Sequence, residues 1–129
     1  MLKRTLIVVL GIAAFIEIAS GILALAFPSA LTLLFKIPTL DATTLYLGAL
    51  IGWQCLAMAA IVCLVIVWMS KEKTEARILT ILLGIWWVAI GLWLFIGFNR
   101  VEHLFVDAVK GALILVLALL WKPQQGTKS

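Results

Sequence analysis

Four long apolar stretches constrain the fold of this chain more than any other feature of its sequence. A helix of about 20 residues crosses the hydrocarbon core of a bilayer, and each stretch is close to that length or longer. None shows the strict alternation of a transmembrane β-strand, and a helix satisfies its own backbone hydrogen bonds in lipid. The sequence therefore predicts an all-α integral membrane protein with four transmembrane helices. They are expected near residues 6–27, 45–69, 76–98 and 104–121.

The same stretches leave almost no chain for a soluble domain. We predict one transmembrane domain over residues 1–121, built as an antiparallel bundle of the four helices, and a disordered cytoplasmic tail over 122–129. Residues 29–35 are apolar but too short to cross, which predicts a short interfacial segment between the first two helices. A cleavable signal peptide is the alternative at the N-terminus. Because the first stretch is longer than the usual apolar region of about 7–15 residues and holds Glu17 at its centre, we expect it to be retained.

The basic residues are divided unevenly between the two sides of such a bundle. Only Lys36 and Arg100 fall on the side opposite the termini. An excess of lysine and arginine marks the cytoplasmic side of membrane proteins, so both termini are expected in the cytoplasm. The net charge of +4 thus requires no nucleic-acid partner, and the lipid bilayer is the expected surrounding. The basic residues on the side of the termini are Lys3, Arg4, Lys71, Lys73, Arg77, Lys122 and Lys128.

Three ionisable side chains, Glu17, Asp107 and Lys110, lie inside the predicted helices. Each costs roughly 2.5–3.5 kcal/mol to insert at the centre of a membrane helix, so such residues usually face a protein interior and serve a purpose. On the fourth helix, His103, Asp107 and Lys110 follow the spacing of a single helical face. This spacing predicts a polar stripe that starts at the outer end of the helix. His103 is either a hydrated residue at the interface or the entry point for a proton.

Helical rise places these residues in one layer of the outer half of the bilayer. Glu17 lies roughly 15 Å below the outer end of its helix, at about 1.5 Å per residue. If the first and fourth helices adjoin, Glu17 is expected to meet Lys110, with Asp107 bridging them. Gln54 or a tryptophan indole then completes the hydrogen bonds. The predicted ligand- or proton-binding residues are Glu17, Gln54, Trp86, Trp87, His103, Asp107 and Lys110.

Charge counting favours one class of function for this layer. Two carboxylates and one ammonium leave one negative charge in an apolar site, which can bind a proton or a cation in its place. The leading prediction is therefore the binding or proton-linked movement of a small, cationic or amphiphilic molecule. The alternative is a structural ion-pair network in a non-catalytic subunit or assembly factor of a larger membrane complex. A third alternative is an intramembrane enzyme in which Asp107 and His103 act as a proton-transfer pair. No nucleophile, metal cluster or cofactor motif accompanies these two residues, so an enzyme is the less favoured prediction and no cofactor is expected.

Glycines at helical spacing predict close packing between helices. Gly48 and Gly52 form a small-xxx-small pattern on the second helix, which lets another helix approach closely. The approaching helix belongs either to this chain or to a second copy in a homodimer, and both alternatives are open at this point. Gly84 and Gly91, seven residues apart on the third helix, mark a second seam.

Residues 11–20, Gly-Ile-Ala-Ala-Phe-Ile-Glu-Ile-Ala-Ser, resemble the first helix of the small multidrug resistance transporters. In that family, a central glutamate binds protons and cationic drugs in turn, which implies this role for Glu17. The chain departs from the family in its charged fourth helix, with Asp107 and Lys110, and in its long first outer loop. In length and layout, it is also similar to the DoxX-like small bacterial membrane proteins, without a shared motif. We assign it to neither family and expect a multi-pass protein of a prokaryotic inner membrane.

Overall fold

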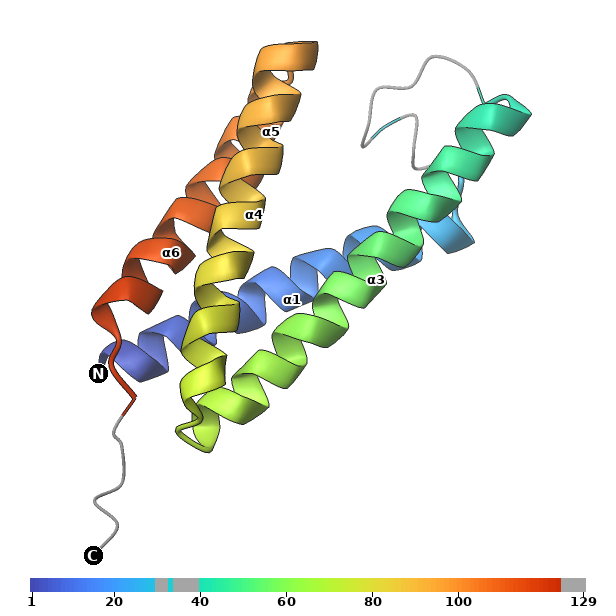
Figure 1. Cartoon of the computed structure of the whole chain (residues 1–129). Coiled ribbons are helices and arrows are strands. Elements are labelled where there is room, and N and C mark those ends of the chain that lie inside the picture. The colour runs from blue at the N-terminus through green and yellow to red at the C-terminus, as the bar shows by residue number, and fades with distance from the viewer. Residues whose placement is uncertain (30–32, 34–39, 124–129) are drawn as a thin grey trace, which may run out of the picture. The chain divides into compact units, whose positions relative to one another are not determined.

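The computed structural model describes residues 1–29, 33 and 40–123 of the chain, and these residues form helices and no strand. Four helical stretches are long and apolar enough to cross a membrane, the fourth being the continuous run Val101–Leu120. The predictions of an all-α chain and of four helices of membrane length are thus confirmed. In chain order the elements are α1 (Leu2–Ala26), α3 (Ala42–Ser70), α4 (Thr74–Phe98), α5 (Val101–His103), the π-helix η1 (Leu104–Val109) and α6 (Lys110–Leu120) (Figure 1).

The chain divides into two compact units. The larger unit contains Met1–Leu10 and Leu64–Ser129, and the smaller contains Gly11–Cys63. Most of the predicted interfacial segment at 29–35 and of the predicted tail at 122–129 lies outside the described residues. The prediction of one transmembrane domain over residues 1–121 stays a prediction.

In the larger unit, α4 and the run α5–η1–α6 form a helical hairpin, connected at Asn99 and Arg100 (Figure 1). The two sides run in opposite directions and approach closely where one of them carries a glycine. Gly84 lies against Leu115, Gly91 against Ala108, and Gly111 against Val88. The fully buried side chains of this unit include Leu6, Leu10, Val65, Met69, Thr80 and Ile114. The first residues of α1 and the last residues of α3 therefore contribute to its core.

The guanidinium group of Arg77 joins the two sides of this hairpin at the end opposite Asn99. Arg77, in the first turn of α4, donates hydrogen bonds to the carbonyl oxygens of Ala118 at 3.2 Å and Leu119 at 2.9 Å. The last carbonyls of a helix have no partner within the helix and carry partial negative charge. Arg77 thus satisfies the end of α6 and fixes it against the start of α4.

Two residues with positive φ make the turns of the larger unit. Asn99, with φ 53°, ends α4, and asparagine tolerates this left-handed conformation. Glu72, with φ 54°, lies in the turn between α3 and α4. There the Glu72 N–H donates to Met69 O at 3.1 Å and the Lys73 N–H donates to Trp68 O at 3.0 Å, which is the Schellman pattern. Glycine usually occupies this position, and glutamate costs about 1 kcal/mol more.

In the smaller unit, the later part of α1 packs against α3, again in opposite directions. A Cβ atom placed on Gly21 would lie 2.8 Å from Leu56 Cγ, and one on Gly52 would lie 2.7 Å from Leu25 Cγ. Gly48 is buried one turn before Gly52. The helix that approaches Gly52 therefore belongs to this chain, which is one of the two predicted alternatives. The homodimer prediction is not tested by this contact.

Asp41 begins α3 as an N-cap, because its Oδ1 accepts a hydrogen bond of 2.7 Å from the Thr44 backbone N–H. Hydrogen bonds from the Thr44 hydroxyl and then from the Thr44 N–H hold the pKa of the Asp41 carboxyl below its usual 3.8. Because the pKa of Asp41 is lower in the folded state, its ionised carboxylate stabilises the fold fully at pH values above the pKa of the unfolded state. This stabilisation is lost as the pH falls through the pKa of the folded state.

We therefore expect the first turn of α3 to lose protection when the pH falls below about 4. Hydrogen exchange of the amides of residues 43–46, corrected for intrinsic rates, measures this loss, which should be several-fold. Asp41→Asn keeps an acceptor that does not titrate, so its protection should not depend on pH. In Asp41→Ala, these amides should exchange rapidly both above and below about pH 4. Equal acid sensitivity in wild type and Asp41→Asn would contradict the role of the carboxylate.

Candidate functional site

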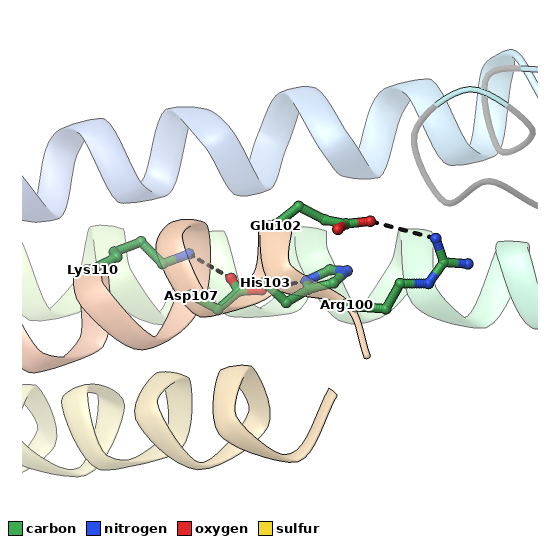
Figure 2. Close-up of polar contacts among 5 residues, drawn as sticks. All are labelled: Arg100, Glu102, His103, Asp107 and Lys110. Carbon is green, nitrogen blue, oxygen red and sulfur yellow. Dashed lines mark hydrogen bonds and ion pairs between the residues drawn. The ribbon is translucent and has the colours of Figure 1, made fainter. Parts of the chain in front are cut away.

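Asp107 is the centre of a polar cluster on the fourth membrane-length helix (Figure 2). Its Oδ2 lies 2.7 Å from His103 Nδ1, and its Oδ1 accepts a hydrogen bond of 3.2 Å from Lys110 Nζ. A carboxylate only accepts hydrogen bonds, so His103 must carry its proton on Nδ1 whenever Asp107 is ionised. The predicted polar stripe thus exists, and both carboxylate oxygens are engaged.

The backbone around Asp107 is π-helical rather than α-helical, over Leu104–Val109. Short π-helical insertions in α-helices occur frequently at functional sites. Gly91 of α4 lies opposite this segment, where an added Cβ would lie 2.5 Å from Ala108 N and 2.8 Å from His103 O. The wide π-helical turn is therefore accommodated where α4 has no side chain. The sequence did not reveal this segment, although the predicted Gly91 seam lies directly against it.

Lys110 connects the cluster to α4. Its Nζ lies 4.5 Å from the centroid of the Trp87 ring, and a cation over an indole face is attracted by the ring electrons. The Lys110 side chain is 10% exposed and Trp87 is 2% exposed. The ammonium is thus held between a carboxylate on its own helix and an aromatic ring on the neighbouring helix.

A second ion pair lies at the start of this helix, as Figure 2 shows. Arg100 Nη1 lies 3.4 Å from Glu102 Oε1, and both side chains are about a third exposed. Exposed ion pairs contribute about 0–1 kcal/mol, so this pair adds little to stability. Neither residue was among the predicted site residues. They place charge beside His103, at the end of the stripe that the sequence assigns to the outer side.

The structure gathers only some of the predicted site residues. Trp87, His103, Asp107 and Lys110 form the cluster, whereas Trp86 is 46% exposed. Neighbouring helical residues point about 100° apart, so Trp87 lies on the buried face of α4 and Trp86 on a more exposed one.

Glu17 and Gln54 belong to the smaller unit. Glu17 is half-buried on the face of α1 that carries buried Ala13 and Gly21, and Gln54 is exposed. The predicted contact of Glu17 with Lys110 stays a prediction.

The formal charge of the cluster depends on the protonation state of His103. With His103 neutral, Asp107 and Lys110 cancel, and the imidazole Nε2 is the nitrogen that accepts a proton. Protonation converts a neutral cluster into one with a single positive charge.

Comparison with models of known protein families, with curated proteins and with solved structures gives no match to this chain.

Proposed function

We propose that this chain is a multi-pass protein of a prokaryotic inner membrane, built as an antiparallel four-helix bundle with both termini in the cytoplasm. The opposed directions of the two helix pairs support the bundle. The excess of lysine and arginine at the end that holds Lys3 and Lys122 supports the orientation. One lysine, Lys36, and one arginine, Arg100, lie on the other side in this topology.

We further propose that the cluster around Asp107 binds or moves a small molecule, with a proton as the coupled species. The main observation in support is that, inside an apolar span, one Asp107 carboxylate oxygen contacts His103 and the other accepts a hydrogen bond from Lys110. An arrangement in which one carboxylate orients an imidazole leaves Nε2 positioned for proton exchange. Charged groups are costly to insert in such a span, so the presence of Asp107 and Lys110 beside a histidine favours a functional site over a purely structural one.

The charge of the cluster determines what proton uptake does to a ligand. When His103 is neutral, the cluster has no net charge, and when His103 is protonated it repels a cation. Proton binding and cation binding therefore weaken each other, which is the linkage that an exchange cycle needs. Glu17 is proposed as the second acid of this function, since its negative charge makes an apolar site attractive to a cation. Gln54 and Trp86 are proposed as further lining residues of the bound molecule.

Uptake of the lipophilic cation tetraphenylphosphonium into proteoliposomes with an imposed pH gradient tests this function. We expect gradient-driven uptake by the wild type, and at least tenfold slower uptake by Glu17→Gln and by Asp107→Asn. Glu75→Gln serves as the control, because it makes the same chemical change at an exposed residue in the first turn of α4, outside the cluster. Uptake by both acid variants at the wild-type rate, with unchanged pH dependence, would rule out proton coupling at these residues.

A second function is favoured by one observation, the bridge from Asp107 through Lys110 to Trp87. This bridge joins η1 to α4 and would serve as a structural pin in a non-catalytic subunit or assembly factor of a larger complex. Native mass spectrometry of the protein extracted in mild detergent separates the two functions. A stoichiometric complex with larger proteins supports the subunit. A monomer or homodimer that retains a small molecule, lost on Glu17→Gln, supports the binding site.

A further inference from the structure

A pocket of about 370 Å³ lies in the larger unit, where α1 begins, α3 turns into α4 and α6 ends. It is separate from the Asp107 cluster, which lies near the other end of the fourth helix. Its lining residues are Met1, Leu2, Lys3, Glu72, Trp121 and Lys122.

The lining combines cationic and apolar groups. Lys3 and Lys122 supply two ammonium groups, and Glu72 supplies one carboxylate, which forms an ion pair with Lys3. Trp121 lines the pocket and is 4% exposed, so most of its surface is packed against the rest of the larger unit. The lining thus has a net positive charge next to apolar surface. This is the chemistry of a site for a negatively charged group attached to an apolar molecule.

The position of the pocket fits such an amphiphile. Its residues flank the ends of membrane-length helices, since α1 begins at Leu2, α3 ends at Ser70 and α6 ends at Leu120. Helix ends of this kind lie at the depth of the lipid headgroups. The same end of the larger unit carries further basic residues, which raise the local concentration of anionic lipid. These are Arg4, Lys71, Lys73 and Arg77.

Glu72 gives the pocket a feature that a general basic surface lacks. It adopts φ 54°, a strained conformation for glutamate, in a turn where glycine would be unstrained. From this position its carboxylate holds the Lys3 ammonium at the pocket. An arriving phosphate would bind Lys122 and compete with Glu72 for Lys3.

We propose that this pocket binds the phosphate group of an anionic phospholipid, with Lys3 and Lys122 as its cationic ligands and Glu72 as an internal competitor. A phosphate group comes either from a lipid or from free phosphate in the cytoplasm. The wall formed by Trp121 and Leu2 favours the lipid, because free phosphate gains nothing from apolar surface.

Native mass spectrometry of the full chain, titrated with phosphatidylglycerol, tests the proposal. We expect Lys122→Gln to weaken the most tightly bound lipid about fivefold, the effect of one lysine near an anionic surface. Lys3→Gln should weaken it similarly, and Lys122→Arg should restore binding. Glu72→Gln should strengthen it severalfold. Lys71→Gln is the matched control, because it removes the same charge from the same end but outside the pocket, and it should change affinity less than twofold.

Three outcomes would overturn the proposal. Equal losses in Lys71→Gln, Lys3→Gln and Lys122→Gln would mean diffuse attraction to the basic end. Equal binding of phosphatidylcholine, whose phosphate is balanced by a choline cation, would mean that net charge is not recognised. Displacement of the lipid by inorganic phosphate at equal concentration would assign the pocket to free phosphate. Protection of the α3–α4 turn from hydrogen exchange in each variant verifies that the pocket is still folded.

Discussion

Alanine at Gly91 or Gly111 is expected to destabilise the α4–α6 hairpin by about 1–3 kcal/mol, the usual cost of overpacking. A Cβ on Gly91 would lie 2.5 Å from Ala108 N, and a Cβ on Gly111 would lie 2.6 Å from Val88 N. Both nearest atoms belong to the backbone, so no side chain can rotate away and the two helices must separate. Denaturation by SDS in mixed micelles measures the loss.

Gly97→Ala is the control on the same helix. The nearest atom to its added Cβ would be Trp93 Nε1 at 3.7 Å, an ordinary contact. Alanine is favoured over glycine in a helix by about 1 kcal/mol, so this variant should be neutral or stabilised. The predicted effects therefore differ in sign for the same chemical change. A stable Gly91→Ala or Gly111→Ala protein would mean that the two helices do not approach as closely as described.

The sequence predicted the helices well because their signal is simple. The membrane-length apolar runs placed the ends of the helices to within a few residues of those in the structure. The glycine seam was predicted in part, at Gly84 and Gly91. Gly111 was missed because it is the single glycine between residues 101 and 121, so no glycine pair at helical spacing marks it.

The site was predicted less completely, for physical reasons. Regular spacing along one helix is enough to place His103, Asp107 and Lys110 on one face. Spacing cannot choose between Trp86 and Trp87, because the choice depends on which face α6 covers. A change from α-helical to π-helical hydrogen bonding leaves no mark in composition, so η1 was not foreseen. Pairings between helices distant in sequence, such as Glu17 with Lys110, are beyond the reach of periodicity.

Removal of the Asp107 charge alone is expected to lower the free energy of unfolding more than removal of the Asp107 and Lys110 charges together. Asp107→Leu takes the carboxylate away from His103 and from Lys110, whose side chain is only 10% exposed. Breaking a buried ion pair from one side costs about 3–5 kcal/mol, whereas replacing both partners with apolar groups is often neutral. The double variant Asp107→Leu/Lys110→Met should therefore recover most of the stability that Asp107→Leu loses. SDS denaturation of the two single variants and the double variant gives the coupling energy.

The same double variant separates a structural cluster from a functional one. If the charges serve only to join η1 to α4, the double variant should retain every property of the wild type. If His103 exchanges protons under the control of Asp107, the double variant should fold and yet lose the pH dependence of cation uptake. The chain contains a single histidine, so ¹⁵N-histidine NMR reports on His103 alone. We expect the Nδ1–H form in the neutral wild type and a mixture of both tautomers in the double variant. An unchanged tautomer and an unchanged titration curve would mean that Asp107 does not orient the imidazole.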